Sequence, residues 1–106
     1  MDFSDLRRVS KLVDRNLARR HHHIKLFLSE WTIPTSPDDI EFNYWVTPQT
    51  QAQWITDAWK IVRHTNLVYA LGWINVFDAP PHTGSAGGLL DRYGNRKPGY
   101  YAFKAG

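Results

Sequence analysis

Cysteine is absent from the 106-residue sequence. Disulfide bridges and thiolate metal sites are therefore excluded, and His, Asp, Glu and hydroxyl side chains remain for chemistry. No apolar run approaches the roughly 20 residues that cross a membrane, and the charged N-terminus lacks the apolar segment of a signal peptide. We expect a soluble chain with no membrane partner. Its length allows one small unit and no second domain.

Lys and Arg are missing from the middle of the chain. Residues 26–59 carry five acids and none of the 13 Lys and Arg residues, whereas residues 1–25 and 60–106 each have a net charge of +4. Most aromatic residues of the middle segment therefore lie among acids, while a nucleic-acid binder is expected to combine aromatic with basic residues. The overall charge of +3 is a weak argument for a nucleic-acid partner, and we expect none.

Apolar residues at helical spacing predict an amphipathic helix over residues 4–20. Its other face is basic and carries Arg7, Arg8, Lys11, Arg15, Arg19 and Arg20. A solvated helix face is the simpler interpretation, and a polyanion-binding stripe is the alternative. Three consecutive His residues, 21–23, follow; because neighbouring side chains point in different directions, they make a poor single-metal site. We expect neither a metal ion nor another cofactor.

Residues 24–29 form a short apolar run, I-K-L-F-L-S, typical of a strand buried on both faces of a parallel sheet. Glu30 and Trp31 follow directly, and an irregular loop begins after them. Catalytic groups of α/β enzymes commonly lie where a strand ends. From its position alone, Glu30 is either such a group or an ordinary exposed carboxylate at a strand end.

A helix, a second strand and a short terminal helix are predicted in the rest of the chain. Thr47-Pro48 marks the start of a helix that continues, by apolar periodicity, to residue 64 or 65. Residues 67–77 form a second apolar strand, interrupted by Gly72, where the missing side chain allows a bulge or a close backbone approach. The next 20 or so residues are rich in turn formers, and residues 99–104 begin the terminal helix.

The predicted order is helix, strand, helix, strand and short helix, with connections long enough for parallel crossovers. No glycine-rich phosphate loop follows either strand, so a nucleotide-binding fold lacks its usual mark. Three helices cannot cover both faces of a two-stranded sheet, and a hydrophobic edge stays open unless another chain or a second copy supplies the rest. The sequence therefore predicts an α/β unit that is part of a domain.

Four segments carry a family resemblance: I-K-L-F-L-S-E-W-T-I-P-T, T-Q-A-Q-W-I-T-D-A-W, A-L-G-W-I-N-V-F-D and G-L-L-D-R-Y-G-N-R-K-P-G-Y-Y-A-F-K. In this order they resemble the C-terminal quarter of a retaining (β/α)8-barrel glycoside hydrolase of the cellulase and β-glycosidase type. The resemblance extends from Ser4 to Lys104, and the last segment is its most specific part. It implies a partial TIM barrel from helix 6 to helix 8, with residues 1–106 as a C-terminal fragment of that domain.

The resemblance also implies roles for individual residues. Glu30, in Ser29-Glu30-Trp31, corresponds to the catalytic nucleophile at the end of strand 7. Trp73 corresponds to a Trp of strand 8 that floors the sugar site, with a barrel-interior core residue as the alternative, and Trp31 is expected to face the same pocket. Trp45 is an outer sugar platform or a loop anchor, and Asp78 holds sugar hydroxyls or structures its loop. The implied partner is a β-linked glycoside or polysaccharide.

The chain departs from the family in what it lacks. Retaining hydrolysis needs two carboxyl groups roughly 5–5.5 Å apart, and the family's acid/base, in an Asn-Glu motif on strand 4, has no counterpart here. Asp78 is a poor substitute, and the remaining candidates are expected on a mobile loop: Asp38, Asp39 and Glu41. We therefore expect no activity from the isolated chain, and completion by the missing barrel strands or by self-association.

Two other hypotheses stay open. One is a non-catalytic module that binds carbohydrate or protein through its aromatic surface. The other, which the charge pattern does not favour, is nucleic-acid binding through the basic first helix; such binding would depend steeply on salt.

Overall fold

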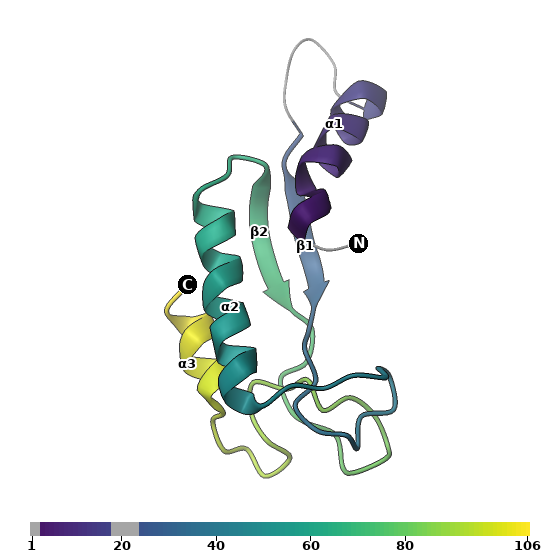
Figure 1. Ribbon diagram of the computed structural model, residues 1–106, viewed down its shortest axis with the longest axis vertical. Coiled ribbons are helices and arrows are strands. Elements are labelled where there is room, and N and C mark those ends of the chain that lie inside the picture. The colour runs from purple at the N-terminus through teal and green to yellow at the C-terminus, as the bar shows by residue number, and fades with distance from the viewer. Residues whose placement is uncertain (1–2, 18–23) are drawn as a thin grey trace.

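The computed structural model describes residues 3–17 and 24–106. It is an α/β unit (Figure 1), and the predicted order of elements is confirmed. The elements are a 3-10 turn, three helices and two strands: η1 (Phe3–Asp5), α1 (Leu6–Leu17), β1 (Leu26–Trp31), α2 (Pro48–Arg63), β2 (Val68–Trp73) and α3 (Pro98–Lys104). The end of the first predicted helix, including Arg19 and Arg20, and the His residues 21–23 lie outside the described residues.

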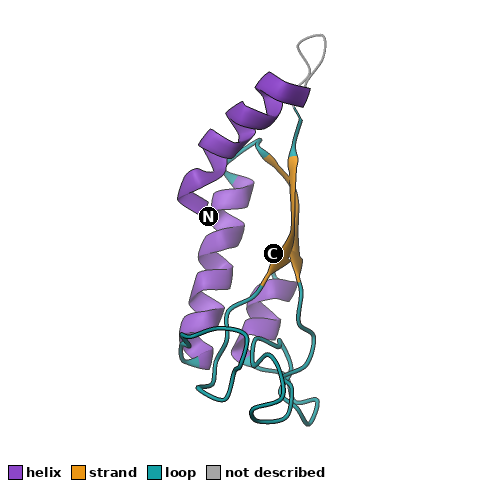
Figure 2. Cartoon of the chain, turned by 90° about the vertical axis from the view of Figure 1, so that its right-hand side faces the viewer, coloured by secondary structure: helices purple, strands orange, loops and turns teal. Residues whose placement is uncertain are grey.

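The two strands are parallel and are joined by the α2 crossover. Leu26 lies opposite Val68 at one end of the pair and Trp31 opposite Trp73 at the other. All three helices lie on one side of this sheet, and no helix of the described residues covers the other side (Figure 2). This arrangement is compatible with part of a (β/α)8 barrel, in which helices surround a closed parallel sheet.

Gly72 lies where the backbones of the two strands come close together. A Cβ at this position would come within 2.9 Å of the Ser29 carbonyl oxygen, and the strand register shifts between Leu28 and Trp31. The predicted close approach and irregularity at Gly72 are therefore both confirmed.

The strand boundaries differ from the prediction because each strand extends only as far as its partner. β1 continues to Trp31, so Glu30 lies inside the strand and not after it. β2 ends at Trp73 and not at residue 77. The last backbone hydrogen bond between the two strands is the one that the Ile74 N–H donates to the Trp31 carbonyl, at 3.1 Å.

α2 begins where local sequence signals predict it. The Thr47 hydroxyl accepts a hydrogen bond from the Thr50 N–H at 3.1 Å, and Pro48 occupies the first turn. The inner face of the helix carries Gln51 and Ile55, both completely buried. Gln51 Nε2 donates to the Ile33 carbonyl at 2.7 Å, which ties α2 to the segment after β1.

The molecule is elongated, with principal extents of 50 × 26 × 19 Å. Its radius of gyration is 15.6 Å, whereas a globular domain of this length has about 13 Å. Large strand side chains stay in contact with solvent, including Phe27 at 62% exposure and Tyr69 at 77%. In the described part of the chain, every helix is too short or too polar to cross a membrane.

Candidate functional site

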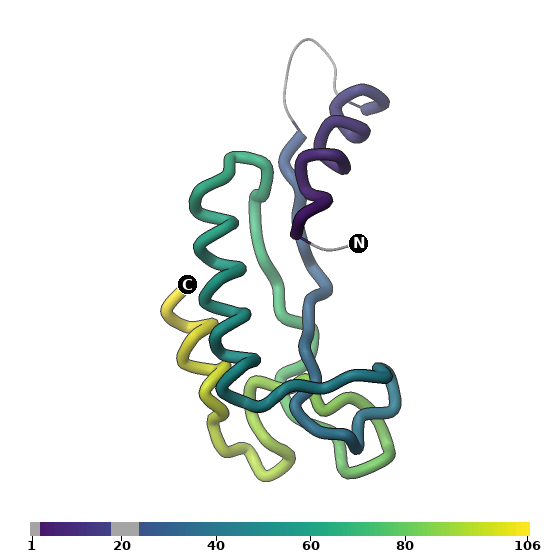
Figure 3. The backbone as a smooth tube through the Cα atoms, viewed as in Figure 1, coloured from purple at the N-terminus to yellow at the C-terminus, as the bar shows by residue number. Residues whose placement is uncertain are grey.

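The carboxyl ends of both strands point to the same end of the molecule, where the loops that follow them gather (Figure 3). The loop after β1 and the loop after β2 are joined by backbone hydrogen bonds. The Thr35 N–H donates to the Ala86 carbonyl at 3.0 Å, and the Ile40 N–H donates to the Gly84 carbonyl at 3.3 Å. This end of a parallel sheet is where α/β enzymes hold their catalytic residues. Of the five candidate residues, Trp31 and Trp73 end the two strands, and Asp78 lies in the loop after β2.

Glu30 is exposed and lies one residue before the end of β1. Its carboxylate has no hydrogen-bond or ion-pair partner among residues 3–17 and 24–106. It lines an open, mostly apolar cavity of about 630 Å³ that runs between β1 and α2 and also includes Trp31, Tyr44, Trp54 and Asp57. The other acid of this cavity, Asp57, is engaged on its own helix by Gln53 at 3.0 Å and Lys60 at 3.4 Å.

Trp31 and Trp73 are brought together at the strand ends. Their rings pack edge to face with centroids 5.0 Å apart, and the indole Nε1 of Trp73 donates to the Gly87 carbonyl at 2.8 Å. The ring of Phe3 packs on Trp31 with centroids 5.4 Å apart, and the ring of Phe103, in α3, packs on Trp73 with centroids 6.2 Å apart. Both indoles are half-buried, so their orientation is set by packing within the chain.

Trp45 lies apart from this pair. Its side chain is 54% exposed, on the segment that connects the loop after β1 to α2. The adjacent residue Tyr44 packs edge to face on Phe42 at 5.7 Å.

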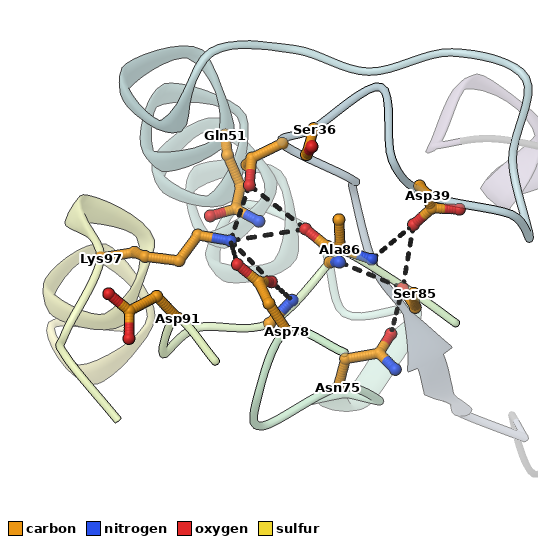
Figure 4. Close-up of polar contacts among 12 residues, drawn as sticks. Ser36, Asp39, Gln51, Asn75, Asp78, Ser85, Ala86, Asp91 and Lys97 are labelled. Carbon is orange, nitrogen blue, oxygen red and sulfur yellow. Dashed lines mark hydrogen bonds and ion pairs between the residues drawn. The ribbon is translucent and has the colours of Figure 1, made fainter. Parts of the chain in front are cut away.

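Asp78 lies in the loop after β2, and both oxygens of its carboxylate are hydrogen-bonded (Figure 4). Lys97 Nζ donates to Oδ1 at 2.9 Å and to Oδ2 at 3.0 Å, and the Gly88 N–H donates to Oδ1 at 2.7 Å. Burial raises the pKa of Asp78 above 3.8, although the Lys97 ammonium and the Gly88 N–H act in the opposite direction. Of the two roles expected for Asp78, these contacts favour structuring its loop.

Lys97 lies at the position that immediately precedes α3, and its side chain is only 9% exposed. In addition to Asp78 it donates to the Thr35 hydroxyl at 2.7 Å and to the Ala86 carbonyl at 3.4 Å. Burial lowers the pKa of Lys97 below 10.5, while the Asp78 carboxylate opposes that shift. The turn-rich sequence before residue 99 does not predict this role for Lys97. The sequence did contain one signal. Ser, Thr, Asp or Asn is the usual residue directly before a helix that begins with Pro, so a Lys at this position is unusual.

Asp39 is also fixed, contrary to the expectation of a mobile loop. Its carboxylate accepts hydrogen bonds from the N–H groups of Glu41 and Phe42, both at 2.8 Å, and from the Ala86 N–H at 2.6 Å. The Ser85 hydroxyl donates a fourth, at 3.2 Å. Burial alone would raise the pKa of Asp39, but these hydrogen bonds together lower it below 3.8. A short-range turn accounts for the first two bonds, and only tertiary structure provides the others.

Of the candidate carboxylates, Glu30 and Glu41 are exposed and have no hydrogen-bond or ion-pair partner in the described ranges. Asp39 and Asp78 are held within the loops, and Asp57 is held on α2. In the described ranges, His, Asp and Glu side chains form no group of three that could hold a metal ion.

No protein-family model matches the sequence, and no curated protein matches it. Among solved structures, the chain is similar to the GH39 enzyme from Xanthomonas axonopodis pv. citri, with a TM-score of 0.61 and 23% sequence identity. The match covers 95% of this chain and 20% of that chain, so this chain spans about a fifth of the length of the enzyme. At this identity the similarity establishes the fold alone.

Proposed function

We propose that this chain is part of a glycoside hydrolase barrel and carries its nucleophile, Glu30. The observation that carries the proposal is a free, exposed carboxylate at the carboxyl end of a parallel strand, in a unit whose fold is that of part of a GH39 enzyme. In (β/α)8 enzymes, catalytic residues come from the carboxyl ends of the strands. In this assignment α1 is helix 6, β1 is strand 7, α2 is helix 7, β2 is strand 8 and α3 is the closing helix.

The proposed reaction is retaining hydrolysis of a β-linked glycoside. The Glu30 carboxylate attacks the anomeric carbon while an acid protonates the leaving oxygen, so that the glycosidic bond breaks and a glycosyl ester forms. Water then hydrolyses the ester, with the second carboxyl group acting as base. Trp31 and Trp73 provide an aromatic surface for the sugar, Trp45 an outer platform, and Asp78 holds the loop that borders them.

The isolated chain lacks the second carboxyl group. Asp39, Asp57 and Asp78 are bound within the fold and are not available as the acid/base. Asp38 and Glu41 lie in the loop after β1 and not on a strand. We propose that the acid/base comes from a strand outside this chain, and we expect the chain to be inactive until the remaining strands are present.

The experiment compares Glu30 variants in a completed barrel. The six missing strands, taken from the GH39 enzyme, are supplied as an upstream fusion or as a co-expressed segment. Aryl β-glycosides then measure hydrolysis by the wild-type sequence, by Glu30→Gln and by Glu41→Gln. Glu41 is the only other Glu in the chain and lies exposed in the loop after β1, which makes it the matched control.

Loss of a nucleophile lowers kcat by several orders of magnitude, so Glu30→Gln should have less than about 0.1% of the wild-type activity. Glu41→Gln should retain it. Equal activity in a folded Glu30→Gln barrel would show that Glu30 is an ordinary strand-end carboxylate.

A non-catalytic carbohydrate-binding module is the second candidate. It is favoured by the exposed aromatic side chain of Trp45, which makes no hydrogen bond or ring contact within the described residues. Such a module would bind oligosaccharides as the isolated chain, and Trp45→Ala would remove the binding. The hydrolase proposal requires the completed barrel for both binding and turnover.

A further inference from the structure

Residues 85–88 form a buried segment that connects the ends of both strands. The Gly87 carbonyl accepts two hydrogen bonds, from the Trp73 indole at 2.8 Å and from the Thr32 hydroxyl at 3.0 Å. Trp73 ends β2, and Thr32 directly follows β1. A single carbonyl group therefore contacts both strand ends and the indole of Trp73.

The residues on either side of Gly87 are both linked to the Lys97–Asp78 ion pair, and Ala86 is held in addition by the Asp39 carboxylate, which accepts from its N–H at 2.6 Å. Ala86 precedes Gly87, and its carbonyl accepts from Lys97 Nζ at 3.4 Å and from the Thr35 hydroxyl, which itself accepts from Lys97 at 2.7 Å. Gly88 follows Gly87, and its N–H donates to the Asp78 carboxylate, which Lys97 holds. Lys97 thus contacts Ala86 directly and Gly88 through Asp78. Figure 4 shows its contacts with Ala86 and Asp78.

The 85–88 segment is closely packed against both strand ends. A Cβ on Gly87 would collide with the Thr32 hydroxyl, and a Cβ on Gly88 would collide with the backbone of Phe77 and Asp78. Closely packed backbone of this kind has few alternative arrangements, so a displaced ion pair moves the segment as a unit.

From these contacts we infer that Lys97 is a positioning residue for the aromatic surface formed by Trp31 and Trp73, acting through Asp78 and residues 85–88. Lys97 does not contact either indole. It fixes the carbonyl group that orients Trp73, against which Trp31 packs. This inference deepens the proposed function and rests on it for the identity of the ligand, a β-linked oligosaccharide.

The test uses the full chain labelled with ¹⁵N, in which five Trp residues give five indole N–H signals. Replacing Lys97 with Met keeps a long side chain and removes the charge; Lys104→Met is the matched control, since Lys104 is exposed in the last turn of α3. Lys97→Met should shift the Trp73 signal and increase its exchange with water, while the signal of the exposed Trp54 stays unchanged. An unchanged Trp73 signal in folded Lys97→Met would overturn the inference.

A second measurement covers the case in which Lys97→Met does not fold. Acidification of the wild-type chain neutralises Asp78, the other member of the ion pair, and the Trp73 indole signal should move with the titration of the Asp78 carboxyl group. The charged groups facing this carboxylate are Lys97 and Asp91. Two other acids titrate nearby: Asp91, whose pKa is lowered chiefly by hydrogen bonds from Asn95, and Asp39, which accepts from the Ala86 N–H at 2.6 Å. The variants Asp91→Asn and Asp39→Asn separate their contributions. A Trp73 indole signal that does not change as the Asp78 carboxyl group is titrated would overturn the inference.

Binding in the completed barrel distinguishes this inference from the proposed function. Lys97→Met should raise the Kd for oligosaccharides about fivefold or more, the effect of coupled contacts, and Lys104→Met should not. If the wild-type barrel binds and hydrolyses oligosaccharides and Lys97→Met binds them equally well, the positioning role is wrong and the proposed function stands. If the wild-type barrel binds none, the proposed function is wrong, and the indole measurements still decide whether Lys97 orients Trp73.

Discussion

Asp39 and Lys97 are two buried charged residues in the loops at the carboxyl ends of the strands. They satisfy their charges in different ways: Asp39 through three backbone N–H groups and a hydroxyl, Lys97 through a carboxylate, a hydroxyl and a carbonyl. Sequence patterns do not reveal either role, because Asp39 binds residues 46 and 47 positions away and Lys97 binds one 62 positions away. Glu30 could be singled out because the apolar run before it and the loop after Trp31 are local signals that predict a position near the end of a strand.

Replacement of Asp39 by Asn should destabilise the chain and change its response to acid. The amide can no longer accept at both oxygens, so buried N–H donors lose partners at a cost of about 1–3 kcal/mol at pH 7. Since the folded pKa of Asp39 lies below 3.8, its contribution to stability is complete above that value and is lost as the pH falls through the folded pKa. Urea unfolding at pH 7 and pH 3 measures both effects.

Asp38→Asn is the control for this substitution, because Asp38 lies next to Asp39, its side chain is 41% exposed, and in the described part of the chain its Oδ1 contacts only His82 Nε2, at 3.3 Å. We expect it to change the free energy of unfolding by less than about 0.5 kcal/mol. If Asp39→Asn lost as much stability between pH 7 and pH 3 as the wild-type chain, Asp39 would not be the source of the acid dependence.

Among the elements, α2 was predicted well because its signals are local: a Thr47 cap, Pro48 in the first turn and apolar periodicity. The end of β2 was not, since Val76 and Phe77 are apolar but have no β1 residue beside them. Strand length depends on the partner strand, which a pattern in one segment does not contain. Gly72 was interpreted correctly because a glycine inside a strand has few structural explanations.

Gly72→Ala should weaken the pairing of β1 with β2. The new methyl group would meet the Ser29 carbonyl oxygen at 2.9 Å, and a backbone atom cannot move aside as a flexible side chain does. We expect a loss of about 1–3 kcal/mol. Hydrogen exchange adds a local readout: the Ile74 amide, which donates to Trp31, should exchange faster.

Gly94 gives the comparison for this substitution. It has a φ of +86°, so Gly94→Ala strains the backbone of the turn at residues 91–94, outside both strands. It should lower overall stability without a selective increase in exchange at Ile74. Equal protection of Ile74 in wild type and Gly72→Ala would contradict close contact at Gly72.

At the scale of the whole molecule, the decisive property is that the sheet is only partly covered by other elements of the chain. The two strands of the described residues form a sheet with two open edges and one side without helices, and the chain is more extended than a globular domain of its length. Open parallel edges and exposed strand side chains favour association. These features are those expected of a part of a barrel.

The isolated chain should therefore self-associate or aggregate. Sedimentation velocity over a range of concentrations should detect species larger than the 12.3 kDa monomer, with a distribution that depends on concentration. Supplying the missing barrel strands should suppress this association, because they cover the same edges. A monodisperse monomer with cooperative unfolding would count strongly against the fragment hypothesis.

The most direct test of the central claim is covalent labelling of Glu30. The completed barrel is incubated with 2-deoxy-2-fluoro β-glycosides of several sugars, which trap the glycosyl ester of a retaining enzyme, and the labelled peptide is identified by mass spectrometry. We predict one glycosyl group per chain, on the peptide that contains Ser29-Glu30-Trp31, and none in Glu30→Gln. A label on Asp78 or on another residue, or hydrolysis by the wild-type barrel with no label on Glu30, would contradict the account.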